Sequence, residues 1–286
     1  MISGLALVAK PAGPTSHDVV DAARRALGTR RIGHLGTLDP FAAGLLVLVV
    51  GRATRLAPFA ARWMKSYAGV IRLGTTTATD DVSGEVVATA EAWRTLDRER
   101  VAAVLAELRG ARLQRPPAYS AVKVAGERAY RRARRGEAVD LAPRPVEVRE
   151  LELTRFEPPD AGFRATVSAG TYLRSLAREA GAALGCGAHL AALVRTRVGP
   201  FRLEDAVGPD AVTLADLRDP ATLVADLPRR ELDAAERTAV VHGRPVALKD
   251  SPAVAGNVAL FAGGQLIAVA ERVGDVLKPG VVVAEP

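Results

Sequence analysis

The sequence predicts an α+β fold in which a large domain precedes a small β-rich one. A chain of 286 residues is long for one compact domain. Apolar residues make up 49% and charged residues 25% of it, which is typical of a globular protein. Strand-like runs alternate unevenly with single helical patterns, unlike the strict repeat of a parallel βαβ fold. We place the large domain at residues 1–225 and the small one at residues 226–286.

The N-terminal part predicts a strand followed by a helix. Leu5 to Ala9 is a short apolar run with strand character. Thr15 or Ser16 can cap a helix, because a side-chain oxygen there accepts from the free N–H groups of the first turn. Gly28 can end that helix in a left-handed conformation.

The next stretch, residues 30 to 44, is rich in glycine and has no clear period, which indicates a long loop that carries function. Beyond it the large domain continues with alternating strand and helix signals. The predicted elements are a buried strand at 45–50, a helix at 52–62, strands at 67–73 and 85–89, a helix capped by Asp97 and closed by Gly110, a basic helix at 126–135, strands at 146–156 and 163–168, and a helix at 171–184.

The tail from about Leu227 predicts a small β-rich module. Asp233 and Glu236 have capping-box spacing, and Gly243 can end the helix that they start. Gly263 and Gly264 separate two apolar runs, which is a hairpin signal, and a last strand is expected around residue 281. The segments Gly243-Arg244-Pro245 and Leu277-Lys278-Pro279-Gly280 resemble the edges of a PUA-type RNA-binding domain, and a structural β appendage is the alternative.

Composition narrows the function classes. Lys and Arg outnumber Asp and Glu by 39 to 32, which favours a polyanionic partner. Cys186 is the only cysteine, and the four histidines show no ligand spacing, so no disulfide and no metal site are expected. The longest apolar run is far shorter than the roughly 20 residues of a membrane span, and the start lacks a signal-peptide layout. We expect a cytoplasmic, metal-free protein.

The most informative segment is the loop from Gly33 to Leu46, which reads GHLGTLDPFAAGLL. Its glycines allow close backbone approach to a ligand. Pro40 restricts Asp39 to extended conformations, so the carboxylate would point in a fixed direction. Most Asp-Pro pairs are nevertheless simple turns.

This loop resembles the catalytic motif of the bacterial TruB family of tRNA pseudouridine synthases, whose pattern is close to GHxGTLDPxAxGLL. Five other segments resemble motifs of the same family in the same order. They are KPAGPTS at 10–16, KSY at 65–67, PAYSAVK with Gly126 at 117–126, GTYLRS at 170–175, and GCGAHL with Leu193 at 185–193. The resemblance extends from Lys10 to about Val198, over most of the predicted large domain.

The resemblance implies a pseudouridine synthase fold with a mixed, largely antiparallel central sheet flanked by helices, and a PUA-like C-terminal domain. It also implies three catalytic residues. Asp39 would be the attacking carboxylate, whether it adds to the base or acts at the sugar. Arg174 would pair with Asp39 and keep it ionised. Tyr67 would stack on the target base near C5.

Substrate-binding roles are implied for a further group of residues. His34 would hold the extruded nucleotide or fill the gap behind it, Tyr172 would line the pocket, and Leu193 would form an apolar wall. Lys10, in the opening motif, is also assigned to substrate binding. The segment at about 115–144 resembles the family's RNA-clamping insertion, and within it we assign RNA contacts to Arg128, Arg131 and Arg132. A solvated basic helix face is the alternative interpretation of these arginines.

The implied activity is isomerisation of uridine to pseudouridine at position 55, in the T-loop of tRNA, after base flipping. The implied partner is the T-arm stem-loop of tRNA, with no cofactor, no membrane and no obligate protein partner, and the protein is expected to be a monomer. Two alternatives stay open. A relative of the guide-RNA-dependent archaeal and eukaryotic enzymes is disfavoured by the arginine-rich insertion, and a non-catalytic RNA-folding protein by the presence of Asp39, Tyr67 and Arg174.

Overall fold

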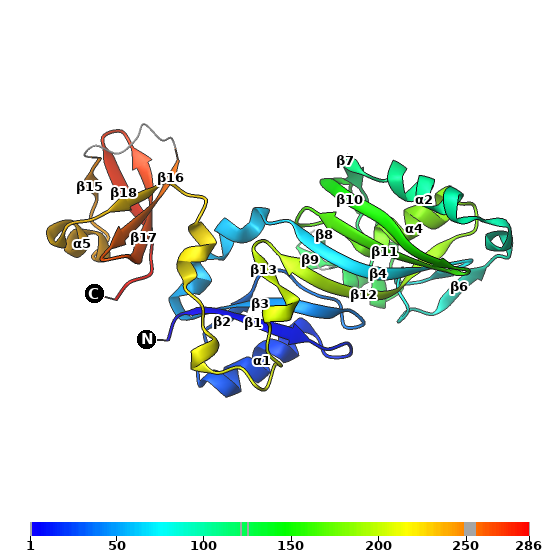
Figure 1. Ribbon diagram of the computed structural model, residues 1–286, viewed down its shortest axis with the longest axis horizontal. Coiled ribbons are helices and arrows are strands. Elements are labelled where there is room, and N and C mark those ends of the chain that lie inside the picture. The colour runs from blue at the N-terminus through cyan, green and yellow to red at the C-terminus, as the bar shows by residue number, and fades with distance from the viewer. Residues whose placement is uncertain (1, 121, 125, 249–255, 286) are drawn as a thin grey trace.

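The computed structural model describes residues 2–120, 122–124, 126–248 and 256–285. Two sheets dominate it (Figure 1). The larger has nine strands in the order β1-β3-β12-β4-β11-β10-β7, with β2 joined to β3 and β13 to β12. The smaller has five strands in the order β14-β16-β17-β18-β15. Each sheet has one parallel pair, β3 with β12 and β14 with β16, and its other pairs are antiparallel. The predicted α+β fold, with a mixed and largely antiparallel central sheet, is confirmed.

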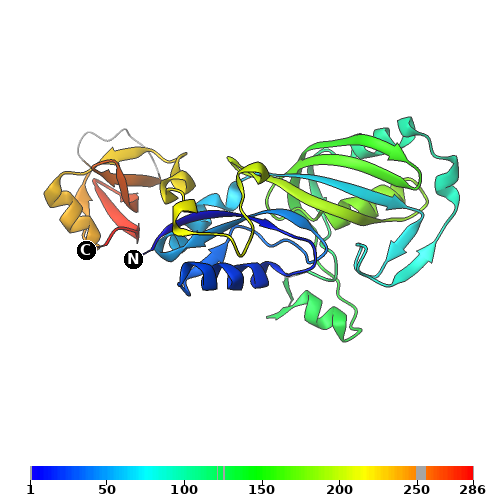
Figure 2. The same ribbon diagram turned by 60° about the horizontal axis from the view of Figure 1, so that its bottom comes forward.

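The N-terminal half of the large sheet is built on β1 (Gly4–Lys10) and β3 (Ala43–Val50). They pair along their length, and α1 (Ser16–Leu27) lies beside them (Figure 2). Thr15, not Ser16, caps α1 and forms a capping box with Asp18. The predicted loop at 30–44 is shorter than expected, because β2 (Ile32–His34) pairs with β3 and buries Ile32.

The centre of the large sheet is β12 (Ala188–Val198), a strand that the sequence did not predict. It runs parallel to β3 and antiparallel to β4 (Lys65–Leu73), and so joins the two halves of the sheet. Its register places Arg195 opposite both Gly44 and Tyr67. Residues of the N-terminal loop and of the second half of the sheet therefore meet at β12.

The second half of the sheet continues through β11 (Asp160–Val167), β10 (Arg144–Glu157) and β7 (Gly110–Gln114). Helices α2 (Arg98–Glu107) and α4 (Leu173–Ala183) cover one face of these strands and share a buried core with them. The predicted cap Asp97 accepts from Arg100 N at the start of α2.

Shorter elements complete the large-sheet part of the chain. They are β5 (Thr75–Thr77), β6 (Val86–Thr89), β8 (Lys123–Val124), β9 (Glu127–Arg128), α3 (Ala129–Arg134), β13 (Phe201–Arg202) and five 3₁₀ segments, η1 (Gly51–Arg62), η2 (Ala92–Thr95), η3 (Leu203–Asp205), η4 (Leu214–Asp216) and η5 (Pro220–Val224). The helix predicted at 52–62 is thus a 3₁₀ segment, which contains Pro58.

The C-terminal sheet is a separate layer whose elements are β14 (Arg229–Glu231), α5 (Ala234–Val241), β15 (Val246–Ala247), β16 (Asn257–Ala262), β17 (Gln265–Val273) and β18 (Val276–Val282). The predicted capping box of α5 and the hairpin at residues 263–264 are confirmed. This sheet packs on the N-terminal half, where Phe261 and Leu266 share a core with Leu5 and Leu45. Arg55 donates to Val282 O at 2.9 Å across the same contact. None of the helices described is long and apolar enough to cross a membrane.

Candidate active site around Asp39

The loop that carries Asp39 is fixed by buried polar side chains. Ser16, at the start of α1, donates to Leu38 O at 3.0 Å and accepts from Leu38 N at 2.9 Å. Lys10, at the end of β1, donates to Ala42 O at 2.6 Å, to Pro11 O at 2.9 Å and to Pro40 O at 3.3 Å. These bonds hold both sides of Asp39 in one conformation.

Arg195, on β12, also holds this loop through hydrogen bonds. Its side chain is fully buried, and its guanidinium donates to Leu45 O at 2.8 Å, Gly36 O at 3.0 Å and Thr37 O at 3.3 Å. No carboxylate among the described residues pairs with it. Gly44 faces it closely, because a methyl group at Gly44 would lie 2.4 Å from Arg195 O. A glycine is therefore required there.

Asp39, in the loop between β2 and β3, pairs with Arg174 of α4. Nε of Arg174, near the start of α4, lies 2.9 Å from Oδ2 of Asp39, and Nη2 donates to Oδ1 at 3.3 Å. The arginine side chain is 5% exposed and the aspartate side chain 37%. The carboxylate is thus gripped on one side by a buried cation and open to solvent on the other.

The remaining N–H groups of Arg174 fix its own position. Nη1 donates to Thr79 O and Nη2 to Tyr119 O, both at 2.9 Å. Asp81, 3% exposed, places Oδ2 3.5 Å from Nη1. Asp81 in turn accepts from Thr79 Oγ1 at 2.7 Å and from Ser83 N at 3.0 Å. Arg174 therefore joins three segments that are far apart in the sequence.

Burial shifts the pKa values of several groups in this region toward their uncharged forms. Burial raises the pKa of the Asp39 carboxyl above its usual value, and the guanidinium of Arg174 opposes that rise. Burial lowers the pKa of Lys10 to about 8, and burial together with Arg195 lowers the pKa of Lys65 to about 8. Burial also lowers the pKa of His34, which favours its neutral form at pH 7.

The structure brings most of the predicted site residues to one region. Tyr67 and Leu193 are buried and share a core cluster with Leu38 of the catalytic loop. Tyr172 is half-buried beside Arg174, and burial raises its pKa. His34 ends β2, and its buried Nδ1 has no hydrogen-bond partner among the described residues. The roles assigned to these residues stay predictions.

The side chain of Lys10 is buried in the protein and does not project toward a substrate. It is 1% exposed, and carbonyl groups of the chain accept its ammonium hydrogens. In this structure it holds the catalytic loop, and its assignment to substrate binding stays a prediction.

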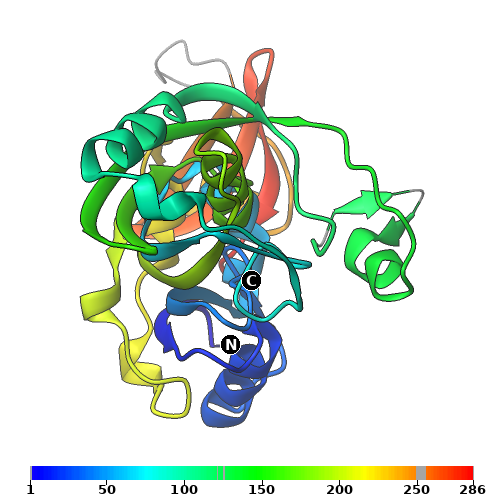
Figure 3. The ribbon, with the colours of Figure 1, turned by 90° about the vertical axis from the view of Figure 1, so that its right-hand side faces the viewer.

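The basic segment predicted at 126–135 forms β9 and the shorter helix α3. Figure 3 shows it, in green, standing apart from the two sheets. Part of its charge is neutralised within the chain, since Arg132 pairs with Glu137 and Arg135 pairs with both Glu127 and Glu137. Arg128 and Arg131 form no ion pair with the described residues. Arg134, which stacks over the Tyr130 ring, likewise has no carboxylate partner among the described residues, so these three arginines carry the charge that can attract an external anion.

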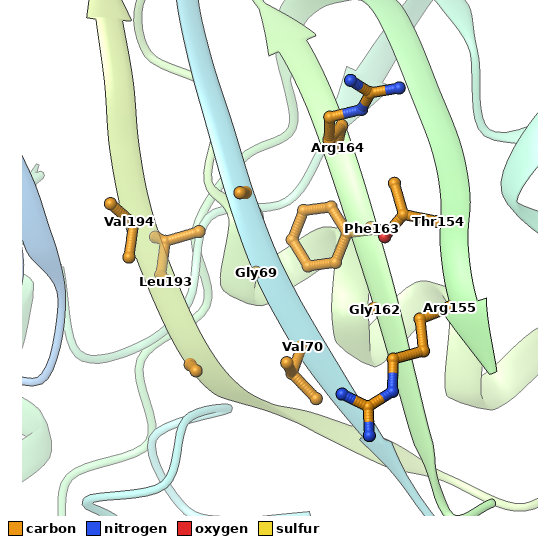
Figure 4. A pocket seen from close by; sticks show the side chains of 11 residues that line it. Gly69, Val70, Thr154, Arg155, Gly162, Phe163, Arg164, Leu193 and Val194 are labelled. Atoms are coloured by element: carbon orange, nitrogen blue, oxygen red, sulfur yellow. The ribbon is translucent and has the colours of Figure 1, made fainter. Parts of the chain in front are cut away.

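A hollow of about 610 Å³ lies on the large sheet away from Asp39. It is lined by Val70, Arg164 and Val194, among others (Figure 4). These side chains alternate with core residues along their strands and so face away from α2 and α4. Leu193 contributes to its floor as well as to the core near Asp39. The hollow contains no carboxylate, so it is not the site of the chemistry assigned to Asp39.

Two residues of the site were missed by sequence reasoning. Arg195 lies on the unpredicted strand β12, within the run ALVRTRV, where a charged residue gives no sign of being buried. Asp81 lies in the turn-rich stretch before Gly84, and its one signal is the set of Thr and Ser neighbours that bond to it. Among the described residues, no cluster of three or more His, Cys, Asp or Glu side chains could hold a metal ion.

Comparison with known proteins gives a consistent result. The model of the TruB family pseudouridylate synthase N-terminal domain matches residues 24–173, and that of the tRNA pseudouridylate synthase B C-terminal domain matches residues 174–235. The tRNA pseudouridine synthase B of Thermobifida fusca is 46% identical, over 99% of both chains. That of Corynebacterium efficiens is 44% identical, over 99% of this chain and 97% of its own.

Solved structures share the fold at lower identity. A chain of the crystal structure of a Cbf5–Nop10–Gar1 complex aligns with a TM-score of 0.75 and 26% identity, over 99% of this chain and 85% of that one. A chain of the archaeal box H/ACA sRNP Nop10–Cbf5 complex aligns with a TM-score of 0.73 and 24% identity, over 99% and 86%. The likeness therefore covers both sheets of the present structure.

Proposed function

The chain belongs to the TruB family of pseudouridylate synthases, and on that premise we propose that Asp39 drives the isomerisation of uridine 55 in the T-loop of tRNA. The protein is an isomerase that converts uridine to pseudouridine in tRNA. One observation carries the assignment of its active site. The Asp39 carboxylate is held by a buried arginine on one side and is open to a ligand on the other.

The reaction is balanced within one nucleotide. The bond between C1′ and N1 of uridine breaks, the base rotates, and a bond between C1′ and C5 forms. The proton on C5 leaves, and N1 ends with a proton. In our proposal the ionised Asp39 is the nucleophile, either toward the base or toward C1′. Arg174 orients it and maintains its charge.

The target base must leave its stack to reach Asp39. Tyr67 and Leu193 lie in the core cluster that contains Leu38, so we assign to them the stacking platform and the apolar wall for the flipped base. Tyr172 lines the same pocket, and His34 holds the extruded nucleotide. Lys10 supports the loop that the nucleotide enters.

RNA outside the reacting nucleotide is assigned to two other parts of the chain. We propose that the segment 115–144 clamps the T-arm, chiefly through Arg128 and Arg131, with Arg132 shared with Glu137. We place the catalytic domain at residues 1–225 and a PUA-like RNA-binding domain at 226–286, because β14 at Arg229 is the first strand of the second sheet. The family model that begins at residue 174 includes α4 and β12 of the large sheet, so its limits differ from this structural boundary.

We further propose that the protein acts in the cytoplasm as a monomer, without cofactor or obligate protein partner. A cation at Arg174 and a partly buried carboxylate at Asp39 supply the charges that the proposed exchange of bonds requires.

The test is tritium release from an unmodified tRNA transcript that carries [5-³H]uridine, with neither metal nor nucleotide added. Wild type and Asp39→Asn are compared, and Arg72→Gln serves as a control because Arg72 lies in an exposed ion pair with Asp160 on the far face of the sheet. We expect release by wild type and the control, and none by Asp39→Asn. Release by Asp39→Asn at the wild-type rate would refute the role of Asp39. Binding of the tRNA without release by any variant would favour an RNA-folding protein.

A further inference from the structure

Lys65 is a cation without a partner beside the catalytic loop. It is the first residue of β4, two positions before Tyr67, so both side chains lie on the same face of the sheet. A methyl group added at Gly36 would lie 2.8 Å from its Nζ. Among the described residues no hydrogen bond or ion pair is made by this ammonium group. Its ammonium group therefore lies against the loop without a hydrogen-bond acceptor or an anion to offset its charge.

The surroundings of Lys65 carry an excess of positive charge. The same added methyl group would lie 3.7 Å from Nη1 of Arg195, whose N–H groups are bonded to carbonyls and not to a carboxylate. Lys10 also contacts this loop, where its ammonium group donates to carbonyl oxygens. The carboxylate of Asp39 is already shared with Arg174. Three cations of this cluster thus lack a carboxylate of their own.

A half-buried ammonium without a partner costs stability, because burial removes water that nothing replaces. The lowering of the pKa of Lys65 to about 8 agrees with that cost. The two other cations of the cluster offset their burial by bonds to the loop, and Lys65 does not. An anion bound beside the catalytic loop would supply the partner that Lys65 lacks.

We infer that Lys65 binds a phosphodiester group of the RNA strand that carries the target uridine. The identity of the anion rests on the proposed function, since RNA is the substrate that would bring phosphate to the loop of Asp39. The position fits the task, because Lys65 adjoins the loop of Asp39 on one side and Tyr67 on the other. A phosphate bound there fixes the backbone of the extruded nucleotide while its base occupies the pocket.

The test measures binding apart from catalysis. All variants carry Asp39→Asn, and the probe is a fluorescently labelled T-arm stem-loop RNA titrated at several salt concentrations. For Lys65→Met we expect about tenfold weaker binding and a salt dependence, d log K/d log[salt], that is smaller by about 0.7 to 0.9. Lys65→Arg, which keeps the charge, should restore the wild-type slope. Arg72→Met, a charge removed from the far face, should leave the slope unchanged.

Thermal unfolding separates this role from a structural one. Because the ammonium makes no bond within the described structure, Lys65→Met should keep or raise the melting temperature while it weakens RNA binding. An unchanged salt slope for Lys65→Met, or a slope that Lys65→Arg fails to restore, would overturn the inference. Tritium release by the wild type is scored separately, so failure of the isomerase assignment would leave the binding result readable.

Discussion

Arg195 gives the sharpest test of how the site is built. We compare Arg195→Met with Arg197→Met, which makes the same change two positions along β12. Arg195 is fully buried and donates to three carbonyls of the catalytic loop and β3. Arg197 is exposed, and among the described residues its one side-chain hydrogen bond is to Gly199 O. Both variants therefore replace arginine by methionine, and only the burial and hydrogen bonding of the replaced side chain differ.

The expected magnitude follows from the bonds lost. Two of the three bonds of Arg195 are 3.0 Å or shorter. A hydrogen bond from a charged donor contributes about 1.5–3 kcal/mol, so the loss of these two bonds costs roughly 3–6 kcal/mol. The burial cost that disappears with the guanidinium offsets part of this loss. A net loss of about 3 kcal/mol lowers the melting temperature by roughly 6–10 °C in a chain of this size. Arg197→Met should change the free energy of unfolding by no more than about 0.5 kcal/mol.

Catalysis should fall further than stability alone explains. Without Arg195 the loop at Gly36 and Thr37 loses its support, and a shift of about 1 Å in a catalytic group can cost on the order of a hundredfold in rate. The assays are thermal unfolding followed by circular dichroism, and single-turnover tritium release at 20 °C, where the variant is still folded. If Arg195→Met melts with the wild type, or if it is destabilised yet turns over at the wild-type rate, the supporting role is refuted.

Three further predictions concern other parts of the site and fold. Arg174→Gln should raise the pKa of Asp39 further, because it removes the cation that favours the ionised carboxylate. The fall in activity on acidification, which marks protonation of this carboxylate, should then occur at higher pH than in the wild type. An unshifted acid limb of the pH–rate profile would contradict this prediction. Gly44→Ala should lower the free energy of unfolding by about 3 kcal/mol or more, because its Cβ would meet the backbone of Arg195. Gly13 has a similar positive φ but open space around it, so Gly13→Ala should be destabilised only by the backbone strain of about 1–2 kcal/mol. Equal unfolding free energies for the two variants would count against the clash. Asp97→Ala should cost about 1 kcal/mol in chemical denaturation through loss of its bond to Arg100 N, and should leave tritium release unchanged.

Local signals predicted much of the fold. The N-terminal caps of α1, α2 and α5 and the hairpin at residues 263–264 follow from residues adjacent in the sequence, and all four are confirmed. The predicted end of α2 at Gly110 is wrong, because the helix ends at Glu107 with Leu108 as its C-cap, and Gly110 begins β7. The strand β12 was not predicted because its apolar residues follow neither a twofold nor a helical period, and because it contains a buried arginine. Its pairing with β3 and β4 depends on the whole sheet, which no short window of sequence contains.

The same limit applies to the site. Asp39 and Arg174 are 135 positions apart, and resemblance to a family, not spacing, brought them together before the structure did. Asp81 and Arg195 carry no comparable signal, since each looks like an ordinary polar residue of a turn or a strand. Only the distances and burial in the folded chain identify them as parts of the support of Asp39.

The late position of β12 in the chain has a consequence for biosynthesis. Asp39 leaves the ribosome early, but Arg174 and Arg195, which hold it and its loop, follow only after most of the large sheet has been made. Closing the sheet then requires pairings of long sequence separation, which form slowly. A slip of β12 by one residue would turn Arg195 and Leu193 to the opposite face. In a nascent chain, Asp39 is therefore synthesised long before the residues that hold it in place. Activity appears only once β12 has paired with β3 and β4 in the native register.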